Sequence, residues 1–530
     1  MEDLKSVDVV IVGGGLAGLS AALKLKDAGK SFVVLESDAR LGGRTLMRFD
    51  ADGNGYDCEF GGGYVGASQN YMQYLLRRFK IQTFRQYLAR NHNWLFQYRD
   101  KTLESFPGDD PLALPGERNA QFILGLVDTL AIDVRAYLPD AWNHPLATTL
   151  DKITVEQWIQ QQLEVFKNPN PQDGEGMSPK TEDAFRTAIR CAFSLEPKDI
   201  SFFFLLYYSA CAGSFAALVD VAGGDGAAEG TRLTFGTQNL VDALRGECSA
   251  AQICEKTRVL KIEHSPEQVT VHTQAGKWKA RRVVVAMSPP ASQRIEYQPQ
   301  LETCEGGLER IALCKAMENC LGRTIKGFVR FKDSVWRTEP RKLMGFLLSA
   351  GPYESCPVAW TLDNVWNPAD DAFPRFRKRE EFTRPGSQVS PRFPAGKQPK
   401  NPTFKLMTFI VGDSAKHWGK QTPQKRAQAV IDQLREVYKF TDADLFDSQD
   451  PLANYQEEDW LRRSREGVPA PAAMMPPQTL TKYGAALRAP IGAIHWAGSE
   501  SALEWCGYMG GAIESGFRVA NVVVAELGEA

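Results

Sequence analysis

The chain has 530 residues, of which 43% are hydrophobic and 24% are charged, and its formal net charge is −2. This composition is typical of a soluble globular protein, and a length prior of about 150 residues per domain predicts roughly three structural units. The near-neutral charge gives no electrostatic reason to expect a nucleic acid or an acidic membrane as a partner.

Several further classes are disfavoured by simple counts. No stretch approaches the ~20 apolar residues of a membrane span. The ten cysteines are scattered from Cys58 to Cys506 without a C-x-x-C pair, which favours a reducing compartment over a disulfide framework. The six histidines show no metal-ligand spacing, so no metal site is predicted. With no signal-peptide pattern and no S-K-L ending, we expect a cytoplasmic protein.

An apolar run, a glycine turn and a helical pattern open the chain. Val9 to Val12 are β-branched, which is typical of a strand buried on both faces of a parallel sheet. Gly13-x-Gly15-x-x-Gly18 follows, with glycine where the turn is tightest, where a pyrophosphate must approach the backbone and where the helix packs on the strand. The helix N-terminus offers free N–H groups to phosphate. The sequence therefore predicts a dinucleotide site.

The second predicted strand, SFVVLE, ends at Glu36, which lies 18 residues beyond Gly18. This spacing is close to the ~20 residues expected for the acid that hydrogen-bonds a ribose hydroxyl of the dinucleotide. Because a glutamate at that place disfavours a 2′-phosphate, we expect the ligand to be FAD or NAD.

Two glycine-rich segments come next, ESDARLGGRTLMRF and EFGGGYVGASQN, and the first contains Arg40-x-Gly42-Gly43-Arg44. The run resembles the N-terminal FAD-binding block of the flavin-containing amine oxidase family, which includes monoamine oxidases and polyamine oxidases. Arginines that frame two glycines let cations reach the pyrophosphate and the flavin edge while the backbone approaches closely. The resemblance implies FAD as the cofactor, with Arg40, Gly43, Arg44 and Gly62 among its contacts.

Strand signals return at TRVLKIEH, QVTVHT and RRVVVAMSPP and again at IGAIHWAG. We therefore expect an α/β fold with a Rossmann-type, glutathione-reductase-like FAD-binding domain built from residues 1–88, 229–307 and 451–530. An α+β substrate-binding domain from residues 89–228 and 308–450 is interleaved with it. In the first insertion, SFFFLLYYS predicts a buried helix that is either plain core or the lining of a pocket.

A proline-rich, basic stretch occupies about residues 371–402 of the second insertion. Its composition predicts a long surface loop. The simpler interpretation is a solvated loop, and the sharper hypothesis is a guide for an amine substrate that also bears acidic groups.

The C-terminal string IHWAGSESALEWCGYMGGAIESG predicts a strand, a turn through Gly498 and Glu500, and a helix that begins near Tyr508 or Met509. A helix N-terminus there sets backbone amides against the flavin pyrimidine edge, where negative charge grows on reduction. The string resembles the family's AGxE…WxGYMxGA block at nearly every fixed position. The resemblance implies that Gly498, Glu500 and Met509 contact FAD and that the backbone of Val259 pairs with its adenine.

Two residues are predicted to carry the chemistry. Lys326, in CLGRTIKGFVRF, matches the family's lysine that holds a water against flavin N5. A cation at that place positions the water and stabilises charge that develops when oxygen takes electrons from the reduced ring. Tyr508 matches one of two facing rings between which family members guide the amine, an attraction suited to nitrogen-bearing substrates.

The chain departs from the family's pattern at two neighbouring positions. Pro471 stands where the second facing ring is expected, and the sequence leaves open whether Trp505, Met474 or another residue closes that side. Ala470 stands where the monoamine oxidases carry the cysteine that bonds the flavin. Because alanine has no thiolate, we expect FAD to be bound noncovalently.

The resemblance implies an enzyme that oxidises an amine to an imine, which water hydrolyses to a carbonyl compound and an amine or ammonia, while O2 is reduced to hydrogen peroxide. The nearest alternative is an L-amino-acid oxidase on the same scaffold, which needs an arginine in the pocket for the substrate carboxylate. A carotenoid-type desaturase or isomerase and a flavin-stabilised scaffold without turnover are the others. The expected partners are a small-molecule amine and O2, and a homodimer is compatible with the sequence.

Overall fold

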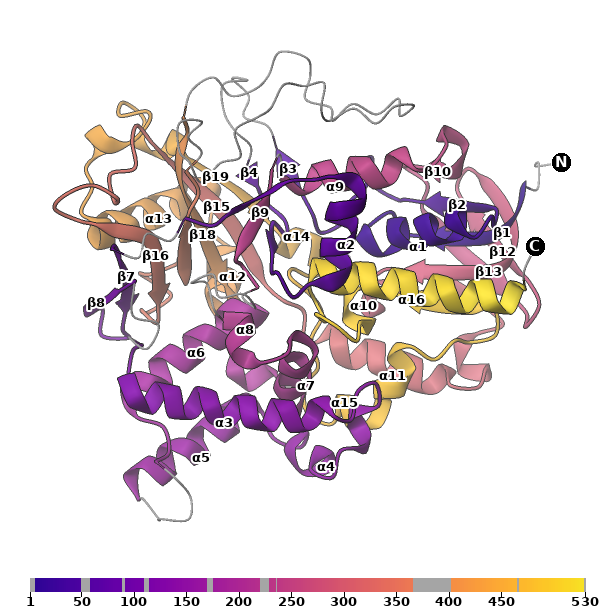
Figure 1. The fold of residues 1–530 in the computed structure, drawn as a ribbon, viewed down its shortest axis with the longest axis horizontal. Coiled ribbons are helices and arrows are strands. Elements are labelled where there is room, and N and C mark those ends of the chain that lie inside the picture. Colours follow the sequence, from indigo (N-terminus) through magenta and orange to yellow (C-terminus); the bar gives the residue numbers. More distant parts are fainter. Residues whose placement is uncertain are drawn as a thin grey trace.

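Two large β-sheets form the framework of the chain (Figure 1). The computed structural model describes residues 5–48, 58–87, 91–108, 114–168, 175–219, 228–234, 236–365, 402–464 and 467–528. The first sheet is 8-stranded, and its order is β10 (Ile253–Cys254), β2 (Phe32–Leu35), β1 (Lys5–Val12), β13 (Gly276–Ala286), β12 (Val269–Thr273), β11 (Val259–His264) and β14 (Glu296–Gln298), with β20 (Ile494–Ala497) beside β13.

Strand β1 lies in the middle of the first sheet because its apolar residues are buried on both faces. It runs parallel to both β2 and β13. Val9 and Ile11 pack on one side against α1 (Leu16–Asp27) and α16 (Met509–Leu527), while Val10 and Val12 join a separate cluster on the other side. The predicted buried strand is thereby confirmed.

Helices α1 and α16 lie side by side on this sheet (Figure 1). Their backbones approach closely because glycine stands at the crossing: a Cβ added to Gly516 of α16 would lie 2.2 Å from the carbonyl oxygen of Ala17 in α1. Helices α2 (Asn70–Phe79) and α9 (Gly236–Gly246) complete this layer, and Leu19, Leu75 and Leu240 meet in its core.

The second sheet is 7-stranded and takes its strands from distant parts of the chain. Their order is β19 (Tyr455–Asp459), β15 (Thr324–Phe331), β18 (Phe404–Val411), β17 (Trp360–Asp363), β16 (Leu343–Ser349), β7 (Asn93–Gln97) and β8 (Leu103–Pro107). Ile325 and Val329 of β15 pack toward α13 (Pro423–Tyr438), and Phe328 belongs to the cluster on the opposite face. Because side chains alternate along a strand, Lys326 shares the face of Phe328.

A group of helices lies beneath the second sheet in Figure 1. They are α3 (Glu117–Arg135), α4 (Ala147–Leu150), α5 (Val155–Lys167), α6 (Pro179–Phe193), α7 (Phe202–Ala212) and α8 (Phe215–Val219). Every residue of α7 is buried, so the SFFFLLYYS segment is a core helix. One of its rings, Tyr208, also lines the cavity described below.

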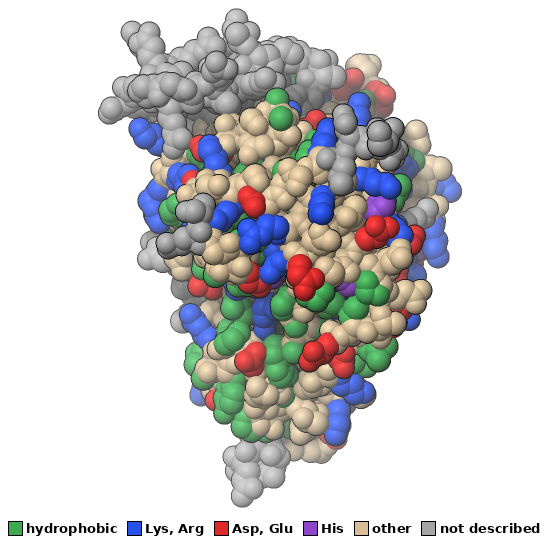
Figure 2. All heavy atoms as spheres, turned by 90° about the vertical axis from the view of Figure 1, so that its right-hand side faces the viewer, with side chains coloured by type: hydrophobic (Ala, Val, Ile, Leu, Met, Phe, Trp, Pro, Cys, Tyr) green, Lys and Arg blue, Asp and Glu red, His purple; other side chains and the backbone are tan. Residues whose placement is uncertain are grey.

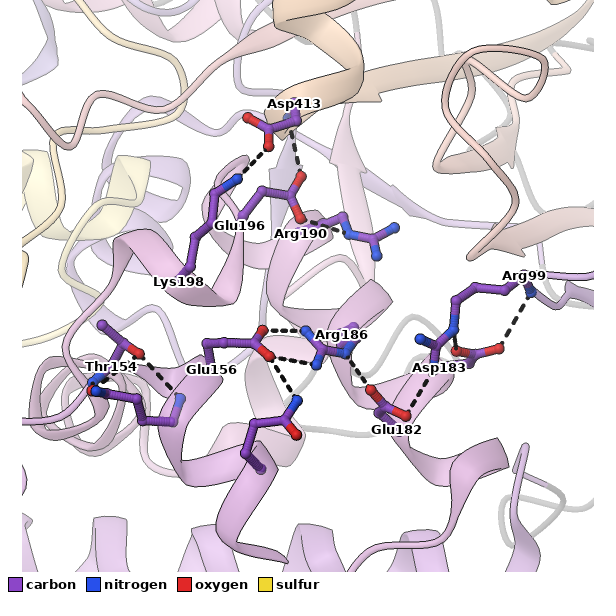
Figure 3. A network of polar contacts seen from close by, with 12 residues as sticks. Arg99, Thr154, Glu156, Glu182, Asp183, Arg186, Arg190, Glu196, Lys198 and Asp413 are labelled. Carbon is purple, nitrogen blue, oxygen red and sulfur yellow. Dashed lines mark hydrogen bonds and ion pairs between the residues drawn. The ribbon is translucent and has the colours of Figure 1, made fainter. Parts of the chain in front are cut away.

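A polar network fastens these helices to the second sheet (Figure 3). Arg186 of α6 is paired with Glu156 of α5 and with Glu182. Arg99, which follows β7, reaches Glu182 with a 2.7 Å contact. Farther along, Lys198 contacts a carboxylate oxygen of Asp413 at 2.7 Å, at the start of α12 (Gly412–Trp418).

The remaining described elements are short or peripheral. They are the strand pair β3 (Met47–Arg48) and β4 (Cys58–Glu59), the three-stranded sheet of β5 (Tyr64–Val65), β9 (Thr231–Leu233) and β6 (Thr83–Arg85), and the helices α10 (Pro289–Ser292), α11 (Gly307–Glu318), α14 (Leu461–Ser464) and α15 (Thr479–Tyr483). The face shown in Figure 2 carries Lys and Arg side chains interspersed with Asp and Glu, so this face presents no field of a single sign.

The predicted α/β fold class is confirmed. Strands expected at the start of the chain, near residues 257–290 and before the last helix are β1, β11, β12, β13 and β20 of the first sheet. β19, from the last of the three predicted FAD-domain segments, pairs with β15 in the second sheet. The domain boundaries as numbered above stay a prediction, and nearly all of the basic stretch 371–402 lies outside the described residues.

The contact between α1 and α16 leads to a stability prediction. We expect Gly516→Ala to lower the free energy of unfolding by about 1–3 kcal/mol, because the added methyl group forces the two backbones apart. Urea unfolding monitored by circular dichroism measures the change. Gly125→Ala in α3 is the matched control, since a Cβ there meets no atom within 4 Å. Loss of a helical glycine should make that control at least as stable as the wild type; equal stability of both variants would contradict the prediction.

Candidate active site

A cavity of about 750 Å³ is lined by residues from both large sheets. Its lining includes the glycine turn after β1, the loop of Gly61 to Gly63, Lys326 on β15 and Tyr508 immediately before α16. It therefore brings together the predicted nucleotide-binding turn and the two residues predicted to carry the chemistry.

The glycine turn is built for close backbone approach. Gly13 has φ +106°, and a Cβ on it would lie 2.6 Å from the carbonyl oxygen of Ala286. A Cβ on Gly18 would lie 2.0 Å from the carbonyl oxygen of Gly13, so Gly18 seats the helix on the strand and does not line the cavity. Gly15 and Gly43 face each other across the lining, with only 3.4 Å between a Cβ on Gly43 and the Cα of Gly15.

Glu36 closes this end of the cavity. Its Oε2 accepts a 2.7 Å hydrogen bond from the backbone N–H of Gly14, and its Oε1 accepts one of 2.8 Å from Asp38. The acid after β2 is thus held directly beside the glycine turn, and its contact with a ribose hydroxyl stays a prediction. Val259, at the start of β11, lines the same cavity.

The two predicted arginines are both cavity residues but have different surroundings. Arg40 donates to the backbone carbonyls of Gly43 at 2.5 Å and Thr45 at 2.8 Å, so it shapes the loop that it precedes. Arg44 makes a bidentate ion pair with Glu500, with contacts of 2.7 and 2.9 Å. Arg44 also donates to the carbonyl of Pro471 at 2.9 Å.

Glu500 does not line the cavity itself; it holds Arg44 in place. Its side chain is only 1% exposed. Burial alone raises the pKa of Glu500, but the charge and hydrogen bonds of Arg44 outweigh burial and hold that pKa below its ordinary value. Glu500 is therefore ionised at neutral pH, and the pair is charged.

The N-terminus of α16 opens onto the cavity, and the helix begins at Met509, where the sequence predicts its start. Met509 is the first residue of α16, and Tyr508 caps it. Gly498 and Met509 line the cavity, and a Cβ on Gly62 would lie 3.3 Å from the side chain of Met509. The partial positive charge of the helix N-terminus is thus directed at this part of the cavity.

Lys326 is buried on β15, and its Nζ donates a 2.8 Å hydrogen bond to the carbonyl of Gly61. The Nζ also lies 5.1 Å from the ring centroid of Phe409. Burial lowers the pKa of Lys326 to about 8, although the negative charge of Glu59 opposes the change. The side chain therefore changes charge close to the physiological pH range.

Two aromatic rings that sequence reasoning missed lie on the strands next to Lys326. The strand register places Phe409 opposite both Lys326 and Trp360. The Trp360 and Phe409 rings stack with centroids 3.9 Å apart, and both line the cavity. Only strand pairing between distant segments brings these rings together, so no local pattern could have identified them.

The wall near Tyr508 differs from a pair of facing aromatic rings. Tyr508 packs against Trp505, with centroids 5.1 Å apart, and against Tyr208, with centroids 6.0 Å apart. Ala470 and Pro471 line the cavity and present neither a thiol nor a ring system with a π-face. Trp505 and Met474, suggested as replacements, are buried and are not lining residues.

The described part of the chain lacks the features of two other classes of site. Within it, no group of three or more His, Cys, Asp or Glu side chains could hold a metal ion. None of its helices combines the length and the apolar character needed to cross a membrane.

Comparison with known proteins gives a consistent result. The family model for flavin containing amine oxidoreductases matches residues 16–524. A protein of Dictyostelium discoideum named probable flavin-containing monoamine oxidase A is 28% identical over 524 residues, which is 98% of each chain. The mouse amine oxidase [flavin-containing] B is 25% identical over 98% of this chain and 87% of its own.

Solved structures show the same fold. Cyclohexylamine oxidase from Brevibacterium oxydans superimposes with a TM-score of 0.77 at 25% identity, over 98% of this chain and 99% of its own. Putrescine oxidase bound to putrescine gives a TM-score of 0.76 at 23% identity, over 99% of this chain and all of its own, and shows likeness of fold alone. The chain belongs to the flavin containing amine oxidoreductases. It is an oxidoreductase of this class, with a flavin as cofactor.

The Arg44–Glu500 pair gives a prediction about the stability of this site. Arg44→Met leaves a buried carboxylate without its cation, so we expect the free energy of unfolding to fall by about 3–5 kcal/mol. Equilibrium denaturation at pH 7 measures the loss. The double variant Arg44→Met/Glu500→Leu removes both charges and should recover part of the stability; a double variant that is as unstable as the sum of the two single changes would contradict a buried, charged pair.

Proposed function

We propose that this chain uses noncovalently bound FAD to oxidise a small-molecule amine to an imine. Water then hydrolyses the imine to a carbonyl compound and an amine or ammonia. O2 accepts the electrons from the reduced flavin and becomes hydrogen peroxide. The main support is one cavity that contains both a phosphate-type glycine turn and a buried lysine. The cytoplasmic location, the homodimer and the acidic groups on the substrate stay predictions.

The residues around the cavity fit a dinucleotide. The glycines leave the backbone accessible at the turn after β1, as a pyrophosphate requires. Glu36 would accept a hydrogen bond from a ribose hydroxyl. Val259 would border the adenine, and the N-terminus of α16 would attract negative charge on the ring system. Noncovalent attachment is supported by Ala470, which lines the cavity without a nucleophile.

When bound, the flavin would supply the acceptor for the hydride that leaves the α-carbon of the amine. The protein's own contribution is to exclude water, orient the amine and control one proton. Trp360 and Phe409 form an apolar wall beside Lys326, and Tyr508 borders the same space. Lys326 would hold a water at its Nζ and supply positive charge where oxygen is reduced. A neutral amine is required, since an ammonium has no lone pair to drive hydride loss.

The alternative of an L-amino-acid oxidase needs a cavity arginine near Lys326 that is free to bind a carboxylate. Arg44 is already paired with Glu500, and Arg40 donates to loop carbonyls. The arginine whose charge acts on Lys326 is Arg232, which packs against the rings of Tyr64 and Phe84 and does not line the cavity. None of the other cavity arginines is among the main charges that act on Lys326; they are Arg258, Arg294, Arg462 and Arg463. The first proposal is therefore the better supported.

Anaerobic mixing of the flavin-loaded protein with a panel of primary, secondary and polyamines tests the proposal. We expect amines to bleach the flavin absorbance and air to restore it with release of peroxide. Bleaching by L-amino acids alone would favour the alternative. Absence of bleaching by either class would leave a flavin-bound scaffold.

Lys326 is predicted to govern the oxidative half-reaction. Lys326→Met should slow reoxidation of the reduced flavin by O2 at least about tenfold, because the cation is lost where oxygen gains charge. Since burial lowers the pKa of Lys326 to about 8, the wild-type rate should fall as the pH rises through that value, and the variant should show no such step. Stopped-flow mixing with O2 measures both.

Lys405→Met is the control for this experiment, because Lys405 is a buried lysine of the same sheet that does not line the cavity. Its reoxidation rate should match that of the wild type. An unchanged rate in Lys326→Met would remove Lys326 from the oxygen reaction.

The mode of flavin attachment is tested by denaturation. We expect acid precipitation to release all of the yellow cofactor into the supernatant, since Ala470 offers no sulfur for a covalent bond. Mass spectrometry of the precipitated protein should give the mass of the unmodified chain. Colour retained in the pellet would contradict noncovalent binding.

A further inference from the structure

Glu229 is a cavity residue that neither the sequence motifs nor the proposed mechanism uses. It lies just before β9 and lines the cavity together with Lys326 and Tyr508. Its Oε2 is buried and has no hydrogen-bond partner among the residues that the structure describes. A buried carboxylate oxygen without a donor is costly, because it has lost its water and gained nothing in return.

The backbone around Glu229 is held on both sides. The N–H of Ala228 donates to the carbonyl of Ala217 at 2.9 Å, and the carbonyl of Gly230 accepts from Gln86 at 3.1 Å. Strand β9 then pairs with β5, where Arg232 lies opposite Tyr64. The position of Glu229 at the cavity wall is therefore fixed by its neighbours in the chain.

The groups that interact electrostatically with Glu229 come from four different elements. They are Tyr64 of β5, Cys191 of α6, Lys326 of β15 and Tyr508 at the start of α16. No ion pair within 4 Å joins Glu229 to Lys326 in the described chain, and Lys326 instead donates to Gly61. Burial raises the pKa of Glu229 to about 8, and the charge of Lys326 opposes this. A cation placed in the cavity would favour the ionised carboxylate.

The cavity lining has a proline at the position where the sequence predicts a second ring facing Tyr508. Pro471 has no π-face, so it offers no cation–π contact to an ammonium group. A carboxylate accepts hydrogen bonds, and none of the described residues donates one to Oε2 of Glu229. A protonated amine supplies up to three N–H donors and a positive charge, which is the complement of this site.

We propose that Glu229 is the substrate-binding carboxylate of this chain: it pairs with the ammonium form of the amine and so makes the cavity selective for cationic substrates. This inference rests on the proposed function, because it places the amine in the same cavity. The Oε2 atom is then also the acceptor for the proton that the amine must lose. The N–H bond breaks, an O–H bond forms on Glu229, and the lone pair stays on the neutral amine.

The test measures binding separately from turnover. tert-Butylammonium carries no hydrogen on its α-carbon and cannot be oxidised, and tert-butanol is its neutral counterpart. Calorimetric titration of the flavin-loaded protein at pH 8 should give a Kd for tert-butylammonium that Glu229→Gln raises about tenfold or more, as expected for loss of a charged hydrogen bond. Glu229→Asp should bind with intermediate affinity, and the Kd for tert-butanol should be the same in all three proteins.

Glu59→Gln is the matched control. Glu59 is a second buried carboxylate near Lys326, but it does not line the cavity, and it already accepts hydrogen bonds from the backbone N–H and the hydroxyl of Thr237 at 2.8 and 2.5 Å. Its substitution should change the Kd for tert-butylammonium much less than Glu229→Gln does, because Glu59 acts on the cavity indirectly, through the charge of Lys326.

The amine that reduces the flavin fastest in the panel gives a second readout. Glu229→Gln should raise the amine concentration for half-maximal reduction about tenfold or more. The increase should be largest between pH 8, the approximate pKa of Glu229, and the pKa of the free amine, because only there are the carboxylate and the ammonium both charged. Equal Kd values for the wild type and Glu229→Gln, equal weakening of tert-butanol binding, or no binding of tert-butylammonium by the wild type would overturn the inference. If no amine reduces the flavin, the proposed function fails, and the calorimetric comparison still decides the role of Glu229.

Discussion

The buried ion pair between Arg44 and Glu500 joins two distant segments of the chain that both contribute to the cavity wall. Arg44 follows the first glycine-rich block, and Glu500 follows β20 near the C-terminus. The same guanidinium also binds the carbonyl of Pro471, so one side chain fixes the glycine loop, the wall of the cavity and the approach to α16. Because the carboxylate is fully enclosed, its stability in the ionised form depends on this single cation.

Much of the flavin-binding half could be predicted from the sequence, because its signals are local. The strand, the glycine turn and the acid at Glu36 fall within a short stretch, and the structure places them together as expected. The start of α16 at Met509 is likewise marked by a contiguous motif. Only the resemblance to the family predicts Lys326 as a site residue, and the structure shows that its side chain is buried and hydrogen-bonded to the carbonyl of Gly61.

The remaining parts of the site depend on contacts that no local pattern records. Phe409 lies beside Lys326, and Trp360 beside Phe409, only through the register of three strands from separate segments. Glu229 precedes a three-residue strand whose partners lie more than a hundred residues earlier in the chain, so its place in the cavity follows from long-range pairing. Even Glu500, which was expected to touch the cofactor, is placed one layer behind the cavity by its pairing with Arg44.

Charge inside the cavity is arranged in two regions. At one end, backbone N–H groups and the N-terminus of α16 supply partial positive charge that does not change with pH, beside the cavity residues Glu36 and Arg40. At the other end, Lys326 and Glu229 both have a pKa of about 8 because burial disfavours the charge of each. Because a basic and an acidic group titrate in the same pH range there, a charged ligand that enters this end of the cavity would shift the protonation of both.

Strand β19 gives the architecture a consequence for how such a protein can vary. The chain leaves the second sheet at β19, passes Ala470 and Pro471 in the cavity wall, and only then returns to the first sheet at β20. Each sheet therefore contributes only part of the cavity wall. Recombination that exchanges one sheet and its helices with those of a relative would replace only part of that wall. New substrate specificity is therefore reached more readily by single substitutions of cavity residues than by such an exchange.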